Sequence, residues 1–310
     1  MTQDVLQSAW KVSLQEEMAT DAAIKQEDID QVVQWCRQQT YLPPVSENTV
    51  ALFLKLSDYN VEKAQTFIDN HYTFRTYYRN IFGDRDPTNA DCKLAMNAIN
   101  AFILPGMTQD RRRVIFASLK SPPDSSRFTA SSGLKYLYMT LEMDILDAGF
   151  GDSDGYSVLF DARGFGLGHL TTISISFLKQ LFSYFLDGAN MAIREINIIN
   201  VNAVVEKLIM MIRSLAPRDL HERIKLYTKD KTEACLAKYP VDILPKELEG
   251  NPKLILQEMT ESNEKKIIAL RSWYLADEKY LRVDESKRPL DKQNKKVIKL
   301  QASLQKIELD

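Results

Sequence analysis

Short apolar runs alternate with helical patterns through the middle of the chain, and this alternation most constrains the fold. The strand-like runs cover residues 111–119, 155–162, 193–202 and 222–229. The longer helical patterns cover residues 133–149, 171–189 and 203–217. Strands joined by helices of about a dozen or more residues form βαβ units, whose strands lie parallel. The sequence therefore predicts an α/β fold with a mostly parallel sheet.

The N-terminal part of the chain has a different pattern. Glycine is absent before Gly83, and the only prolines there are Pro43 and Pro44. Helical spacing dominates, with Ser46 placed to cap one helix. We therefore predict an N-terminal helical bundle at residues 1–90. An α/β domain would follow at 91–284, and a charged extension at 285–310.

Composition argues against several classes of protein. The 310 residues carry a net charge of −2, which provides no general attraction for nucleic acid. Three cysteines without CxxC spacing predict buried, reduced thiols rather than a disulfide framework or metal site. The N-terminus lacks a basic segment followed by an apolar run, and no run approaches the ~20 apolar residues of a membrane span. We expect a cytoplasmic protein, monomeric, with no metal and no cofactor.

A glycine-rich stretch, VLFDARGFGLGH at residues 158–169, raises the question of a nucleotide phosphate site. Its glycines follow G-x-G-x-G spacing, whereas the dinucleotide fingerprint is G-x-G-x-x-G. A Walker loop requires a Gly-Lys pair, and none occurs in the chain. The stretch is better interpreted as a flexible strand-to-helix connection in which glycine permits unusual backbone angles.

Catalytic patterns are equally weak. The three histidines, His71, His169 and His221, follow no metal-ligand spacing, and the cysteines do not cluster near them. No G-x-S-x-G nucleophile elbow occurs. The sequence therefore favours a non-enzymatic protein, although a dyad assembled from distant residues would leave no local signal.

Two helical segments are more apolar than one buried stripe requires. Residues 173–186 and 204–215 are apolar around most of the helix circumference. Such helices are either buried on all sides in a large core or face an apolar guest that is not protein. Both interpretations remain open at this point. Met210 and Met211 suit a surface that must repack.

The order of five short motifs resembles the CRAL-TRIO (Sec14-like) family, close to its retinaldehyde-binding and α-tocopherol-transfer branch. The motifs are LFLKLSDYNVEKAQTFIDNHYTFR (52–75), VLFDARGF (158–165), IREINIINVN (193–202), IRSLAPRDLHERIKLY (212–227) and LPKELEG (244–250). Each is weak alone, but their order and spacing are specific. The chain departs from the family pattern at Asn202, where proline is usual, and at residues 213–216 and 248–250.

The resemblance implies a carrier whose cavity has a sheet floor and apolar walls, with residues 203–216 as a mobile gate. Alternation on the strands, helical spacing and matching family positions nominate its lining. These candidates are Leu134, Leu137, Leu141, Tyr156, Val158, Phe160, Leu167, Leu181, Tyr184, Phe185, Met191, Ile196, Ile198, Val205, Leu208, Ile209 and Ile212. Ordinary core packing is the alternative for each.

The nominated lining is almost uncharged, which favours a neutral ligand such as a tocopherol, retinoid or carotenoid. The resemblance also implies transient contact with anionic or phosphoinositide-containing membranes through a basic patch. Its candidates are Arg194, Arg213, Arg218, Arg223 and Lys225. A lipid-sensing or scaffolding module without transfer activity is the alternative function.

Overall fold

The computed structural model describes residues 2–121 and 123–289, which form two compact units. The helical unit contains residues up to Arg85 together with Ser174–Asn190 and the segment from Ser272. The α/β unit contains Asp86–Ile173 and Met191–Arg271. The predicted domain boundaries at 90/91 and 284/285 stay predictions. Residues 290–310 of the predicted extension lie outside the described part of the chain.

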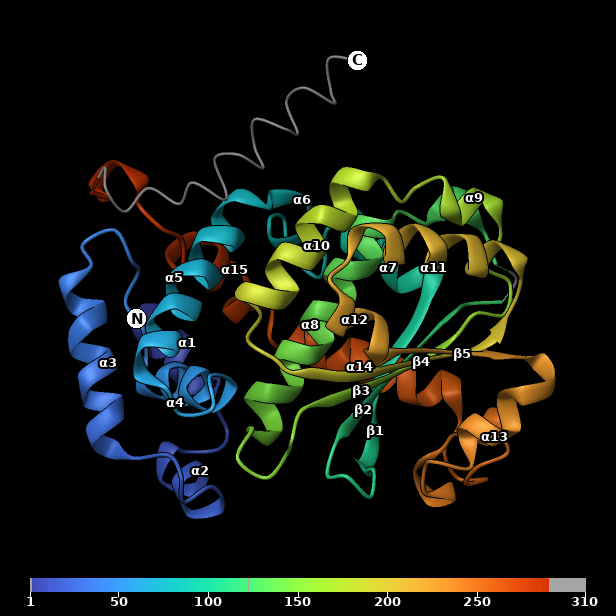
Figure 1. Ribbon diagram of the computed structural model, residues 1–310, viewed down its shortest axis with the longest axis horizontal. Helices are drawn as coiled ribbons and strands as arrows, with labels where there is room; N and C mark the ends of the chain where they lie inside the picture. The colour runs from blue at the N-terminus through green and yellow to red at the C-terminus, as the bar shows by residue number, and fades with distance from the viewer. Residues whose placement is uncertain (1, 122, 290–310) are drawn as a thin grey trace. The chain divides into compact units, whose positions relative to one another are not determined.

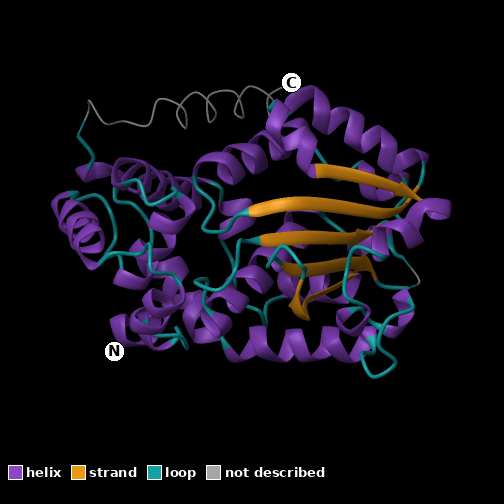
Figure 2. Ribbon diagram, turned by 60° about the horizontal axis from the view of Figure 1, so that its bottom comes forward, coloured by secondary structure: helices purple, strands orange, loops and turns teal. Residues whose placement is uncertain are grey.

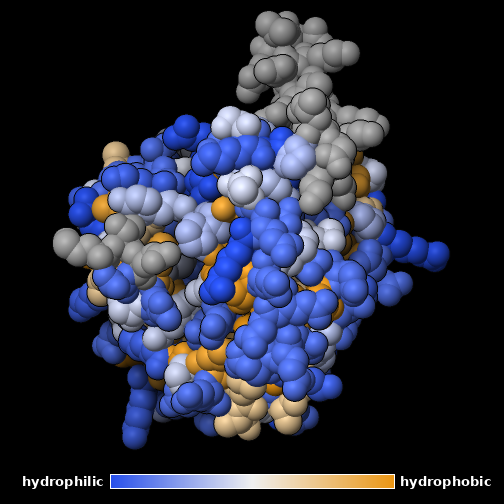
Figure 3. Space-filling model, turned by 90° about the vertical axis from the view of Figure 1, so that its left-hand side faces the viewer, coloured by the Kyte–Doolittle hydropathy of each residue, from blue (hydrophilic) through white to orange (hydrophobic). Residues whose placement is uncertain are grey.

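The helical unit is built from short amphipathic helices with polar caps. Ser46 accepts a hydrogen bond from the Thr49 amide, so the predicted cap is confirmed. The face shown in Figure 3 is mainly hydrophilic, with hydrophobic side chains visible in small separate areas. The helices of this unit are α1 (Thr2–Ser8), α2 (Leu14–Thr20), α3 (Gln26–Gln38), α4 (Glu47–Leu56), α5 (Val61–Tyr77), α6 (Arg79–Phe82), α10 (Ile175–Asp187) and most of α15 (Arg271–Tyr280).

The α/β unit contains a five-stranded sheet in the order β1-β2-β3-β4-β5 (Figures 1 and 2). β1 pairs antiparallel with β2, and the other three pairings are parallel. The predicted mostly parallel α/β fold is therefore confirmed. The strands are β1 (Ile99–Met107), β2 (Arg113–Leu119), β3 (Tyr156–Asp161), β4 (Ile193–Val201) and β5 (Ile224–Thr228).

Helices cover both faces of this sheet (Figure 1). On one face, α14 (Leu256–Ala269) and α13 (Thr232–Leu236) contribute to a buried core with Leu159 and Ile199. On the other face, α11 (Ala203–Leu215) packs on Phe160 and Ile198. The remaining helices of the unit are α7 (Ala90–Ala98), α8 (Ala130–Ala148), α9 (Leu167–Leu170) and α12 (Arg218–Arg223).

Sequence patterns did not predict β1. This strand begins at Ile99, directly after α7 ends at Ala98, so no glycine or proline separates the two elements. Periodicity alone cannot divide a continuous helix-to-strand junction. The same patterns also left α14 and α15 unpredicted. β1 is one of the two edge strands, and its antiparallel pairing with β2 makes the sheet mixed.

Candidate ligand-binding site

The two faces of the central strand β3 are buried to different degrees. Ser157, Leu159 and Asp161 point to one face and are at most 1% exposed. Val158 and Phe160 point to the other face and remain only partly buried. A central strand of a helix-covered sheet is normally buried on both faces. At Val158 and Phe160 the second face is therefore covered less completely than the first.

Helix α11 meets this face through a narrow stripe. Val205 and Ile209 are each 2% exposed, whereas Met210 is 62% exposed. Val204, Leu208 and Ile212 are partly buried in the same apolar cluster. The all-round apolar character of this segment therefore does not reflect burial on all sides. Its remaining apolar surface is available to solvent or to another apolar partner.

The cluster beneath α11 brings together part of the predicted lining. It joins Phe160 of β3 with side chains of β4 and α11 that lie far away in sequence. The predicted members are Phe160, Ile196, Ile198, Val205, Leu208, Ile209 and Ile212. Sequence reasoning missed further members, namely Leu119, Ala162, Phe165, Leu170, Ile173, Val201, Val204, Ile224 and Leu226. Leu226 follows the alternation of β5 and could have been found that way.

Other predicted lining residues of the α/β unit have varied environments. On α8, Leu134 and Leu137 are partly buried and Leu141 is buried. Met191 is also buried, whereas Leu167 on α9 is 61% exposed. Leu134 and Leu137 on α8 are thus partly buried, as are Val158 and Phe160 on β3. An exposed leucine is instead suited to contact an apolar surface outside the protein.

The Tyr156 hydroxyl belongs to a network of hydrogen bonds within the protein and is therefore not free to bind a ligand. Its hydroxyl donates to Asp144 Oδ2 at 2.7 Å, and Arg113 donates to the same oxygen at 3.2 Å. Arg113 also pairs with Asp152 at 2.7 Å. Burial raises the pKa of Asp144, and burial together with the Asp144 charge raises the pKa of Tyr156. Its phenol is therefore committed to holding β3 against α8.

Three predicted lining residues, Leu181, Tyr184 and Phe185, lie on α10 in the helical unit. Tyr184 is fully buried there, with its ring 4.5 Å from that of Phe82. Its hydroxyl lies 3.3 Å from His71 Nδ1. Tyr184 thus contributes to the core of this unit. Leu181 and Phe185 are partly buried, and their role as lining stays a prediction.

The predicted basic patch contains both engaged and available cations. Arg223 donates to the Ile193 carbonyl at 2.9 Å, Arg194 donates to the Asp154 carbonyl at 2.8 Å, and Lys225 pairs with Glu195 at 2.7 Å. Arg213 and Arg218 are exposed and form no ion pair within the described part of the chain. These two arginines are therefore the ones best able to meet an external anion.

Internal contacts organise the glycine-rich loop. Gly164 has φ +80°, and a Cβ there would lie 2.7 Å from Pro123, so the predicted need for glycine is confirmed at this position. Asp161 accepts from Arg163 Nε at 2.7 Å and from Asn200 Nδ2 at 2.9 Å. The strand-terminal carboxylate thus fixes the loop and the neighbouring strand.

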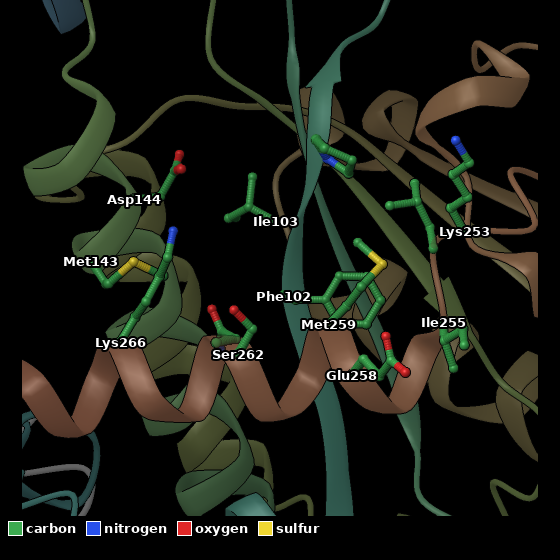
Figure 4. A pocket seen from close by; sticks show the side chains of 13 residues that line it. Phe102, Ile103, Met143, Asp144, Lys253, Ile255, Glu258, Met259, Ser262 and Lys266 are labelled. Carbon is green, nitrogen blue, oxygen red and sulfur yellow. The ribbon is translucent and has the colours of Figure 1, made fainter.

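A hollow lies between α8, α14 and β1 (Figure 4). Its volume is about 310 Å³. Asp144, Glu258 and Lys266 contribute charge to its lining, and Phe102 and Met259 contribute apolar surface. This mixed lining differs from the uncharged cluster beneath α11. It is the less suitable site for a fully apolar ligand.

Within residues 2–121 and 123–289, no group of three or more His, Cys, Asp and Glu side chains could hold a metal ion. All three cysteines are buried, and burial raises the pKa of Cys235 to about 11. Across the same described ranges, no helix combines the length and apolar character needed to cross a bilayer.

Two family models match parts of this chain. Residues 98–250 match the model of the CRAL/TRIO domain, and residues 21–92 match that of the Pinta-like UBA domain. No curated protein matches the chain in sequence. Among solved structures it is similar to one titled "Crystal structure of Sfh5", at 14% identity and a TM-score of 0.49, covering 81% of this chain and 92% of that one. The chain is therefore similar to the CRAL/TRIO family over residues 98–250.

Proposed function

We propose that this protein binds a small, mostly neutral hydrophobic ligand and transfers it between membranes. Binding of lipids in general accords with its CRAL/TRIO domain. The finer proposal names a tocopherol, a retinoid, a carotenoid or a similar lipid. The observation that carries it is the partial exposure of Phe160, which packs against α11, and of Val158 on the same face of this central strand. The loosely packed face between sheet and helix is the place for the guest.

The chemistry of this face supports a neutral guest. A charged headgroup buried against the apolar cluster beneath α11 would lose its hydration, which disfavours a charged guest. A guest that buries about 400 Å² of apolar surface gains roughly 10 kcal/mol of gross driving force. Part of this gain is lost to the entropy of association, which leaves useful affinity without any ionic contact.

Helix α11 is the proposed gate. Only Val205 and Ile209 are fully buried along it, so few contacts need to break when it moves. Met210 on α11 and Leu167 on α9 expose large apolar side chains. Such side chains can enter the interface of a membrane while the helix opens. Arg213 and Arg218, at the end of α11 and the start of α12, would face its anionic headgroups.

Mass spectrometry of the organic extract from natively purified protein tests the binding proposal. We expect one lipid-like molecule for each protein molecule, neutral and largely apolar. An empty protein that also fails to take up any member of a panel of tocopherols, retinoids, carotenoids and sterols would contradict a carrier. That result would favour the scaffolding alternative.

Vesicle co-sedimentation tests membrane contact separately. We expect binding to increase with the content of anionic lipid and to fall as the salt concentration rises. Removal of one arginine should weaken binding by up to about fivefold. Arg213→Gln and Arg218→Gln should weaken this binding. Lys253→Gln, an exposed cation outside the patch, is the matched control. Binding that is indifferent to anionic lipid and salt would exclude this membrane contact and leave ligand binding untouched.

A further inference from the structure

A polar pocket of about 600 Å³ lies at the carboxyl ends of β2 and β3, beside α14. This volume is in the usual range for small-molecule sites. Its walls come from β1, β2, β3, the glycine-rich loop, the turn η4 (Lys246–Leu248) and α14, all within the α/β unit. Of its lining residues, only Leu119 also belongs to the apolar cluster beneath α11. The pocket is therefore a separate site from the one proposed for the apolar ligand.

Two nearly buried polar side chains in this lining have unused hydrogen-bonding capacity. Asn100 and Ser118 lie opposite each other on β1 and β2 and are 9% and 7% exposed. Asn100 donates through Nδ2 to Ser118 Oγ at 3.0 Å. Within residues 2–121 and 123–289, the Ser118 hydroxyl donates to no acceptor, so its hydrogen is available to a ligand.

The carbonyl oxygen of the Asn100 side chain is similarly underused. Its contact with Thr260 Oγ1 is 3.4 Å long, whereas the single hydrogen of that hydroxyl has a nearer acceptor, the Leu256 carbonyl, at 2.9 Å. Thr260 is only 1% exposed, so it positions Asn100 and does not itself meet a ligand. Asn100 and Ser118 thus offer an acceptor and a donor side by side.

The charged side chains of the lining disfavour an anion. Arg163 donates through Nε to Asp161 at 2.7 Å, and Lys120 donates to Glu264 at 3.0 Å, so each cation already has an acid. The lining also includes Glu247 and Glu261, and its acids therefore outnumber its cations. An anion would meet paired cations and an excess of negative charge.

The acids do not form a strong cation site either. Glu247 accepts from the Leu256 amide at 3.1 Å, and Glu261 accepts from Gln257 Nε2 at 2.9 Å. Both glutamates are exposed, and exposed charges contribute little to an ion pair. Their remaining oxygen lone pairs can still accept hydrogen bonds from neutral donors.

We propose that this pocket binds a neutral polyhydroxylated compound of the size of a monosaccharide. A hydroxyl group both donates and accepts, so several hydroxyls on one compact frame can use the mixed donors and acceptors of this lining. Asn100 and Ser118 together match one such group. Leu119 and Leu256 provide apolar surface for the C–H face of the same ring. The bound group is either a free sugar or the sugar headgroup of a glycolipid.

A ligand-observed NMR titration of the full chain with glucose, galactose and mannose tests the proposal. We expect saturable binding of at least one hexose at a single site. Phosphate, added at constant ionic strength, should not compete. Ser118→Ala should weaken binding about fivefold, because it removes a hydrogen-bond donor at almost unchanged volume. Ser57→Ala, a buried serine of the helical unit, is the matched control and should bind as the parent protein does.

A second variant separates a neutral ligand from an anion and leaves the buried residues intact. Glu261→Gln should weaken hexose binding about threefold, because it replaces a charged acceptor with a neutral amide. The same change would strengthen binding of an anion. Glu258→Gln, an exposed acid on the same helix but outside the pocket, is the matched control and should leave hexose binding unchanged.

Absence of saturable hexose binding by the parent protein would overturn the proposal. Parent-like binding by both Ser118→Ala and Glu261→Gln, or displacement of the hexose by phosphate, would overturn it as well. Vesicles that contain a galactosyl lipid distinguish the two sources. Sedimentation that depends on Glu261 and is displaced by free galactose identifies a lipid headgroup. Hexose binding that depends on Glu261, without sedimentation, identifies a free sugar, and both of these results support the site.

Discussion

Asn202 ties the start of α11 to the glycine-rich loop, because its Nδ2 donates a 2.8 Å hydrogen bond to the Phe165 carbonyl. The other atom of the same amide, Oδ1, accepts from the backbone amides of Val204 and Val205 at 3.0 and 3.1 Å. One side chain thus caps the proposed gate helix and fixes it to the loop. Proline, which the family pattern usually has at this position, could do neither.

Replacement of Asn202 by alanine should loosen the N-terminal turn of α11. Loss of a helix cap costs about 1 kcal/mol of unfolding free energy. Amide hydrogen exchange in the first turn of α11 should accelerate as well. Asn89→Ala provides the matched control, because Asn89 caps α7 through the Cys92 amide at 2.8 Å. It should cost similar stability without faster exchange in α11, and equal protection of α11 in both variants would contradict the proposed tie.

Neighbouring residues of β3 should respond in opposite ways to substitution. Val158→Phe places a larger ring on the loosely packed face, so ligand uptake should fall while unfolding free energy changes by less than about 1.5 kcal/mol. Leu159→Ala opens a hole in the dense face and should cost about 2–5 kcal/mol, with ligand stoichiometry retained in the folded protein. Urea denaturation and the lipid-to-protein ratio measure these effects. Strong destabilisation by Val158→Phe would show that this face is packed as tightly as the other.

His71 should make stability fall as the pH decreases from about 7 to 5. Its Nδ1 lies 2.8 Å from the Gly188 carbonyl, and burial together with the Arg75 charge lowers its pKa well below the usual 6.5. Between that depressed value and the unfolded value near 6.5, only the unfolded chain takes up the proton, so acid favours unfolding. His71→Gln should flatten this part of the profile of unfolding free energy against pH. A His71→Gln profile with the same slope as that of the parent protein would contradict this assignment.

Asp277 should contribute stability that is lost at lower pH than the stability that depends on His71. Neighbouring arginines hold its pKa well below the usual value, against the opposing effect of burial. Its contribution is complete above the unfolded pKa near 4 and is lost as the pH falls from there toward the depressed folded value. Asp277→Asn should cost about 3–5 kcal/mol at pH 7, because the buried Arg75 and Arg85 and the partly buried Arg282 lose the charge of their shared partner. The variant should also lose the corresponding acid dependence, which denaturation at several pH values would reveal.

The local pattern of apolar residues was sufficient to predict most strands and helices of the α/β unit. The apolar run at 155–162 became β3 (Tyr156–Asp161), and the helical pattern at 203–217 became α11 (Ala203–Leu215). These predictions succeeded because periodicity records which side of an element is buried. The strand β1 was not predicted because no local sequence signal marks its junction with α7. The lining residues nominated from the sequence stay predictions, although several of them meet in one cluster.

The order of elements, the α/β class and the family motifs were contained in the sequence itself. The tertiary structure alone decided that Val158 and Phe160 are less buried than the opposite face of β3, and that Asp277 pairs with a residue 202 positions earlier, Arg75. Residue spacing reveals neighbours within one helix or strand, a few residues apart. Packing density and the pairing of distant charges depend on which elements meet, and that is fixed only when the whole chain has folded.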